Sequence, residues 1–306
     1  MTTPRRQLID SEQPLFYHLV SRCVRKSWLC GRDSHTNRDY THRKAWLIQR
    51  LHQLAKAFPV EIHAYAIMSN HFHLVVYYDP RLSEQWSDHE VASRWLVACP
   101  VRDRNGLIDD LVTQDRVAAL SADPSRIAQL RRRLGSLSVF MQLLKQPIAR
   151  RANLEDECRG HFFEQRFYSG ALMSEAAVLA AMAYVDLNPI RARIAQSIAD
   201  CKHTSVAERL RRSSGVSQLD EALLPLVSGL EISTAESTTS LEVSLSSYLA
   251  YLDTLVPQVI TPPSKPTRWQ QQVALLKKQQ RVYGPLEVIR DWIQRRGMQL
   301  RERPLV

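Results

Sequence analysis

Two histidines separated by one residue are the first candidates for chemistry. His71 and His73 flank Phe72 in the segment HFHLVVY, which is predicted to be a β-strand. Because side chains two residues apart on a strand point to the same face, the two imidazoles project side by side, with Phe72 behind them. Such a pair can hold a divalent ion through two nitrogen ligands. The same pattern also occurs in structural or surface histidines, and the spacing alone leaves that interpretation open.

A tyrosine and an asparagine form the second candidate pair. Tyr184 and Asn188 lie in the segment AYVDLNPIRARI, which is predicted to be a helix ending near the Asn188–Pro189 bond. Residues four apart share one helix face, so a phenol and an amide are presented together. Asp186 falls on a different face, so a tyrosine–aspartate pair is not indicated. The alternative interpretation is a core tyrosine followed by an ordinary helix end.

The charge balance favours a polyanionic partner. Lys and Arg together number 41 and Asp and Glu 31, which gives a net charge of +10 over 306 residues. Residues 124–154 hold seven basic residues and no acidic one, and residues 265–303 hold ten basic against three acidic. Two such zones predict surfaces that follow a phosphate backbone. The candidate DNA contacts are Lys145, Arg150, Arg151, Arg166, Arg191 and Arg193.

Composition excludes several other classes of protein. No run of 18 apolar residues occurs, so no membrane span is expected, and the polar residues 1–12 do not form a secretory signal. The five cysteines have no CxxC or zinc-finger spacing, which favours reduced thiols. We therefore expect a cytoplasmic protein that does not bind membranes.

The elements that must position these residues form an α+β pattern. Strands are predicted at 16–24, 60–68, 71–77 and 162–172, with helices at 36–58, 126–153 and from Ser174 to about residue 187. This order predicts a ferredoxin-like antiparallel sheet with packed helices over residues 1–205, with an insertion at about 80–124. Residues 206–306 are predicted to form a linker and a helical C-terminal module, a candidate DNA-binding unit.

Four segments resemble the REP-associated tyrosine transposases, which are relatives of the transposases of small hairpin-ended insertion sequences in the HUH endonuclease superfamily. The segments are YHLVSRCVRKSWLCG, SNHFHLVV, HFFEQRFYSGAL and AYVDLNPIRA, and the resemblance covers about residues 15–204. The order of these segments is more specific than the histidine pair alone.

The resemblance implies a role for each candidate residue. His71 and His73 match the paired metal-binding histidines, Tyr184 matches the nucleophile, and Asn188 matches a polar third metal ligand, where some relatives carry Gln. The cofactor implied is a divalent metal, Mg²⁺ or Mn²⁺. The partner implied is single-stranded or hairpin DNA of the repetitive extragenic palindrome type, cleaved and rejoined through a 5′-phosphotyrosine by a monomer or homodimer.

Two alternatives stay open at this point. One is a catalytically idle protein that binds DNA hairpins with the same fold, and the other is a metal-dependent hydrolase that uses water and keeps Tyr184 in its core. Tyr65 and Tyr168 lie in predicted strands, where packing is the simpler role. His18 and His63 also lie on predicted strands, and His63 is interpreted as structural.

Overall fold

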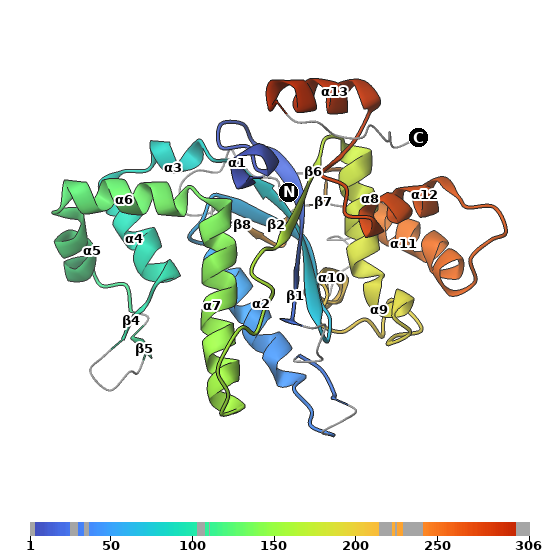
Figure 1. Ribbon diagram of the computed structural model, residues 1–306, viewed down its shortest axis with the longest axis horizontal. Coiled ribbons are helices and arrows are strands. Elements are labelled where there is room, and N and C mark those ends of the chain that lie inside the picture. Colours follow the sequence, from blue (N-terminus) through green and yellow to red (C-terminus); the bar gives the residue numbers. More distant parts are fainter. Residues whose placement is uncertain are drawn as a thin grey trace.

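The computed structural model describes residues 4–24, 30–33, 37–102, 108–109, 111–213, 222–223, 225–228 and 241–297. Its centre is a sheet in the order β10-β6-β1-β3-β2-β8 (Figure 1). The four longer strands pair with one another in antiparallel fashion and comprise β1 (Leu15–Arg22), β2 (Val60–Ile67), β3 (His71–Tyr78) and β6 (Tyr168–Leu172). The edge strands are β8 (Val227–Ser228), antiparallel to β2, and β10 (Val282–Tyr283), parallel to β6.

The strands alternate between two apolar clusters, one on each face of the sheet. On β3, Phe72, Leu74 and Val76 belong to one cluster, whereas Val75 belongs to the other. This period of two places His71 and His73 on the same face as Val75. The short Ser69-Asn70 connection joins β2 to β3 as a hairpin.

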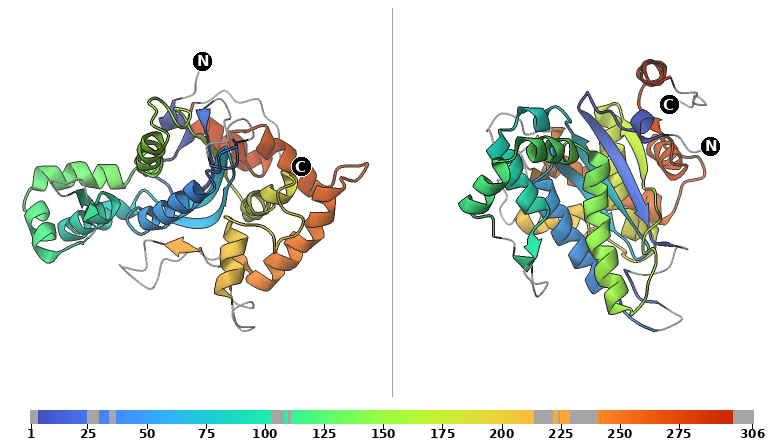
Figure 2. Two further views of the ribbon diagram at one scale, coloured as in Figure 1. Left: turned by 90° about the horizontal axis from the view of Figure 1, so that it is seen from below. Right: turned by 60° about the vertical axis from the view of Figure 1, so that its left-hand side comes forward.

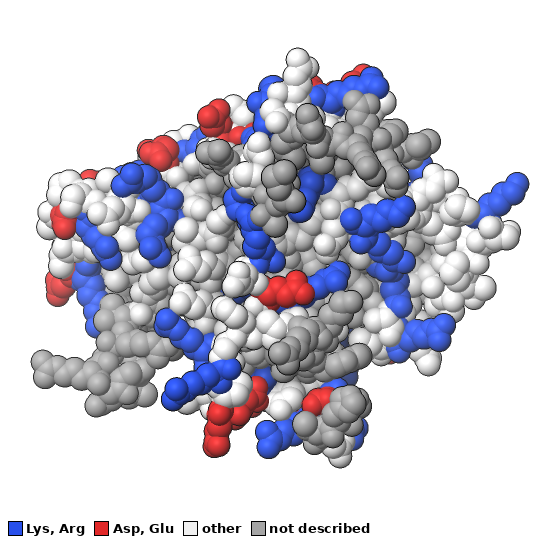
Figure 3. Space-filling model, viewed as in Figure 1, with Lys and Arg blue, Asp and Glu red and all other residues white. Residues whose placement is uncertain are grey.

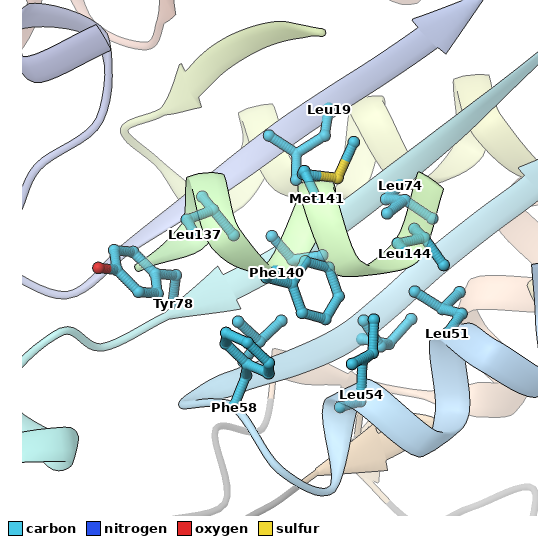
Figure 4. Packing of buried hydrophobic residues seen from close by; sticks show 14 of the residues in the cluster. Leu19, Leu51, Leu54, Phe58, Leu74, Tyr78, Leu137, Phe140, Met141 and Leu144 are labelled. Carbon is cyan, nitrogen blue, oxygen red and sulfur yellow. The ribbon is translucent and has the colours of Figure 1, made fainter. Parts of the chain in front are cut away.

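Two long helices cover the face that carries Phe72. They are α2 (His42–Ala55) and α7 (Leu137–Glu155), and both pack against the sheet through large apolar side chains. Figure 4 shows Phe140 and Met141 of α7 lying among Leu19, Leu74 and Phe58. The order β1, α2, β2, β3, α7, β6 with the strand order β6-β1-β3-β2 is the ferredoxin-like arrangement. The α+β fold predicted from the sequence is confirmed.

A second layer of helices covers the opposite face, which carries the histidines (Figure 2). Its central helix is α8 (Glu175–Asp186), which packs on β2 and β3. The Ser174 side chain caps this helix by accepting a hydrogen bond from the amide of Ala177. The helices that follow are α9 (Asn188–Arg191), α10 (Ser205–Arg212), α11 (Leu245–Ile260) and α12 (Arg268–Lys277).

The predicted insertion is a mainly helical unit at one side of the molecule (Figure 1). It consists of α3 (Leu82–Gln85), α4 (Asp88–Ala98), β4 (Val101–Arg102), β5 (Ile108–Asp109), α5 (Gln114–Ser121) and α6 (Pro124–Leu134). The single helix predicted at 126–153 is instead two helices, because Gly135 caps the end of α6 and Ser136 caps the start of α7, and α6 packs against α4 and α5. The bounds of the insertion at about 80–124 stay a prediction.

The C-terminal part contains strands as well as the predicted helices. Besides α10 to α12 and α13 (Leu286–Arg295), it contributes β8 and β10 to the two edges of the central sheet, and β7 (Ala222–Leu223) pairs with β9 (Leu241–Ser244). Near the N-terminus, α1 (Arg5–Leu8) precedes β1. The boundary at residue 205 stays a prediction. No helix among the described residues has the length and apolar character needed to cross a membrane.

Candidate active site

The two histidines of β3 both use Nδ1 for a hydrogen bond and leave Nε2 free of described partners. Their ring centroids are 4.8 Å apart. His71 Nδ1 lies 2.6 Å from the side-chain oxygen of Asn70, and His73 Nδ1 lies 2.9 Å from Nε2 of His18. Within the described part of the chain, neither Nε2 atom has a hydrogen-bond partner. A second group that engages Nδ1 is the usual way in which proteins orient a histidine that binds a metal through Nε2.

His18 on β1 is a third histidine of this cluster. Its ring plane is tilted only 9° from that of His73, and the two centroids are 5.2 Å apart. With a nitrogen–nitrogen distance of 2.9 Å, the rings must lie edge to edge in nearly one plane, which is the geometry of an N–H···N hydrogen bond. His18 is therefore placed to fix the orientation of the His73 ring.

The sequence did not predict a role for His18. On β1, His18 pairs with Val75 and Val20 pairs with His73, so the two histidines are diagonal neighbours across the strands. That contact depends on the register between strands separated by about 50 residues in the chain. The signal in the sequence was only that His18, like His73, lies on a predicted strand.

Burial keeps these imidazoles neutral. Burial, followed by the nearby Arg22 and Arg191, lowers the pKa of His71 to about 4. Burial also lowers the pKa of His73 well below its ordinary value, with further contributions from His71 and His18. A neutral imidazole keeps a lone pair on one nitrogen, so both rings are in the form that can bind a cation at neutral pH.

Tyr184 lies directly against the histidines. Its ring meets the ring of His73 edge-on, with centroids 5.5 Å apart and planes at 88°, and it meets His18 at 5.8 Å and 81°. The side chain is 6% exposed, and its hydroxyl makes no hydrogen bond to any described residue. Tyr184 and the histidine pair are thus on the same side of the sheet, and the Tyr184 hydroxyl has no hydrogen-bond partner among the described residues.

The end of α8 is anchored by a buried carboxylate. Asp186 accepts hydrogen bonds from the Ser205 hydroxyl, from the Val206 amide at 2.9 Å and from the Tyr248 hydroxyl at 2.7 Å. These bonds tie α8 to α10 and α11 and hold the turn of helix that carries Tyr184. Asp186 points away from Tyr184, as the helical spacing predicts.

Asn188 opens the short helix α9, four residues after Tyr184. It is 7% exposed, and its amide nitrogen is buried without a hydrogen-bond partner among the described residues. A buried amide is expected to have a partner. In the described parts of the chain, no group of three or more His, Cys, Asp or Glu side chains is arranged to hold a metal ion. A cation at this site would therefore need an oxygen ligand besides the two imidazoles, and the metal-binding role of Asn188 stays a prediction.

Two arginines lie close to the histidines. The Arg191 guanidinium stands 4.4 Å from the centre of the Tyr184 ring, and its Nη1 atom is buried without a partner in the described part of the chain. Arg22 is the β1 residue opposite His71. Both arginines lower the pKa of His71 and of His73, which reflects their proximity. Arg191 was predicted to contact DNA, whereas Arg22 was not singled out, because only the strand register brings it here.

The other predicted DNA contacts lie elsewhere. Arg193 follows α9, exposed, with a left-handed φ of 57°. Lys145, Arg150 and Arg151 are on α7, which covers the opposite face of the sheet. Arg150 is exposed, and the Arg151 guanidinium stacks 3.8 Å from the Trp46 ring. Arg166 is exposed just before β6. The structure thus separates the basic residues of α7 from Tyr184 by the thickness of the sheet.

Comparison with known proteins gives a distant structural likeness. No protein-family model matches the chain, and no match is found among curated proteins. The chain is similar to a solved REP-associated tyrosine transposase bound to a REP hairpin, with 13% identity and a TM-score of 0.36 over 69% of this chain and 87% of that chain. A likeness of this degree does not assign an activity.

Proposed function

We propose that this protein is a metal-dependent DNA endonuclease and strand transferase of the tyrosine transposase type, acting on single-stranded or hairpin DNA. One observation carries the proposal. The uncommitted phenol of Tyr184 lies edge-on against His73, beside a second imidazole whose Nε2 is also free of described partners. A nucleophile and a pair of neutral metal-type ligands on one surface are the parts that phosphoryl transfer to tyrosine requires.

The donor set supports a divalent ion, Mg²⁺ or Mn²⁺. His71 and His73 would bind it through Nε2 and Asn188 through its amide oxygen, since the two imidazoles are neutral and their Nδ1 atoms are engaged. Mn²⁺ accepts nitrogen ligands more readily than Mg²⁺. The ion would supply a positive charge to a nonbridging phosphate oxygen and so stabilise the transition state.

The chemistry proceeds in two exchanges of phosphate esters. The phenol oxygen of Tyr184 attacks phosphorus while the P–O3′ bond breaks; the phenol proton passes to solvent, and the departing 3′ oxygen takes up a proton. The DNA is then linked to Tyr184 through its 5′ phosphate. Attack by a 3′-hydroxyl of another strand forms a new P–O3′ bond, releases Tyr184 and rejoins the DNA. Arg191 and Arg22 orient the phosphate through charge-assisted hydrogen bonds.

A cleavage assay with labelled hairpin DNA and Mn²⁺ tests this proposal. The wild-type protein is expected to nick the DNA and to become covalently attached to it, and Tyr184→Phe is expected to lose both reactions. Tyr251→Phe, on α11, serves as the matched control and is expected to behave as wild type. Retention of the hairpin without cleavage would identify a DNA-binding protein instead. Cleavage that survives Tyr184→Phe would identify a hydrolase that uses water.

A further inference from the structure

A groove with a volume of about 570 Å³ lies between α7 and the chain that leads into β6. Its walls come from three parts of the sequence, namely α1, α7 and residues 160–167. Each part contributes one cation: Arg5, Lys145 and Arg166. Glu164 is the acidic residue among those that line the groove. Figure 3 shows basic side chains in the middle of this face, between the positions of α7 and β6 in Figure 1.

Neutral groups hold Lys145 and Arg5 in place. Lys145 donates a hydrogen bond to the backbone oxygen of Glu164 at 2.8 Å. Arg5 donates to the backbone oxygen of Phe167 at 2.5 Å and lies 3.5 Å over the ring of that residue. Among the described residues, Arg5, Lys145 and Arg166 form no ion pair with a carboxylate. Their positions are fixed, but their charges are not balanced at close range.

The pKa values of Lys145 and Arg5 are lowered in this arrangement. Burial, followed by the charge of Arg5, lowers the pKa of Lys145 to about 8. Burial, followed by Arg166 and Arg281, lowers the pKa of Arg5 to about 10. Partly buried like charges destabilise one another, and the charge of Glu164 offsets only part of this effect on Lys145. An anion bound between the cations would reduce their mutual repulsion further.

The groove is connected to the Tyr184 site by a short series of aromatic contacts around the edge of the sheet. The Arg281 guanidinium, whose charge acts on Arg5, lies 5.6 Å from the centre of the Tyr168 ring. The Tyr168 ring lies 5.9 Å from the ring of His18, which contacts Tyr184. The groove and the Tyr184 site are therefore linked through side chains that belong to β6 and to the residue before β10.

We propose that this groove binds backbone phosphates of the DNA strand that is cleaved at Tyr184, a role that rests on the function proposed above. The three phenylalanines that line the groove are at most 8% exposed, so they offer no open ring on which a base could stack. Recognition here is by charge, and its contribution to affinity is the same for every base sequence.

Fluorescence anisotropy with labelled single-stranded oligonucleotides of two unrelated sequences tests the groove. The double variant Lys145→Gln/Arg166→Gln is compared with Arg126→Gln/Arg132→Gln, which removes the same charge from exposed positions on α6. We expect the groove variant to lose about tenfold in affinity for both sequences, and the slope of log K against log salt to fall by about 0.7 for each lost phosphate contact. The control variant should keep the wild-type slope. Arg166→Gln alone changes an exposed position and is expected to give a smaller loss of affinity. It keeps the test valid if the double variant misfolds.

The outcomes separate this inference from the proposed chemistry. Equal losses of affinity in the groove and control variants would overturn the groove assignment, because the effect would then be one of net charge. If the groove variant binds DNA as tightly as wild type and wild type forms a covalent adduct, the assignment of the groove is overturned and the proposed chemistry stands. Loss of affinity in the groove variant, while wild type forms no adduct, overturns the proposed chemistry and leaves the groove in place.

Discussion

The two faces of the central sheet hold positive charge in different ways. On the α8 face, Arg22 and Arg191 stand beside buried neutral imidazoles and a phenol, which are groups that can act on a phosphate. On the α7 face, Arg5, Lys145 and Arg166 line a groove whose phenylalanines are buried, and the described residues that line it include no comparable cluster of tyrosine and paired histidines. Basic residues thus mark where a phosphate can lie, while only the neighbouring side chains decide what can happen to it.

The sharpest way to break this comparison is to remove a metal ligand from the α8 face. His73→Ala leaves one imidazole at the site, and adduct formation should fall by at least about a hundredfold, since charge stabilisation by a metal contributes several kcal/mol. Anisotropy measurements should show DNA affinity within about twofold of wild type, because the groove retains its cations. A variant that keeps its cleavage rate would remove the histidine pair from the mechanism.

A second variant tests the contact between His18 and His73. His18→Phe removes the hydrogen bond to Nδ1 of His73 but keeps a ring of similar shape. Mn²⁺ affinity, measured by titration calorimetry, should fall by about 10- to 100-fold, as is typical when the group that orients a metal ligand is lost. His18→Gln, whose amide can bond Nδ1, should recover part of that loss.

His63→Phe is the matched control for His18→Phe. His63 is also a buried strand histidine, but its ring packs against Phe16 rather than His73. Unchanged Mn²⁺ affinity in His18→Phe, or an equal loss in His63→Phe, would reduce the His18 contact to ordinary packing.

A third prediction concerns the support of Tyr184. Tyr248→Phe deletes one hydrogen bond to the buried carboxylate of Asp186. The free energy of unfolding in urea should fall by about 1–3 kcal/mol, because a buried charged acceptor loses a donor. Single-stranded DNA binding at the groove should not change in conditions where the variant is folded, and a change there would mean that the two faces are coupled.

The smallest effect is a pH dependence confined to the α7 face. Because the pKa of Lys145 is lowered to about 8, its charge is present at neutral pH and is lost as the pH rises through that value. Raising the pH from about 7 to about 9 should weaken binding of a short single-stranded oligonucleotide a few-fold in wild type. The same change should have less effect on Lys145→Gln. Equal pH dependence of the two proteins would place the titrating group elsewhere.

Local patterns in the sequence were enough to place the candidate residues on one strand and one helix, whereas their catalytic roles came from the family resemblance. The spacing of His71 and His73 on a strand fixes a common face, and the Ser174 cap fixes the start of the helix that carries Tyr184. The alternation of β3 and the Ser69-Asn70 turn determine the hairpin. These features depend on neighbours within a few residues, so the sequence displays them directly.

Contacts between distant segments could not be read in the same way. The approach of His18 to His73 and of Arg22 to His71 follows from the register of β1 against β3. The count of basic residues over 124–154 suggested one phosphate-binding surface, but Arg131 forms an ion pair with Asp88 at 2.7 Å and Arg151 stacks on Trp46. The edge strands β8 and β10 are too short to leave a periodic pattern in a segment predicted as helical.

The central claim is that Tyr184 becomes bonded to DNA, and peptide mapping tests it most directly. The folded protein is incubated with Mn²⁺ and a hairpin oligonucleotide, digested, and its peptides are identified by mass spectrometry. We expect one nucleotide-bearing peptide, with the phosphate on Tyr184, and its absence from Tyr184→Phe. Nicked DNA with every tyrosine peptide unmodified, or with the phosphate on a different residue, would contradict it.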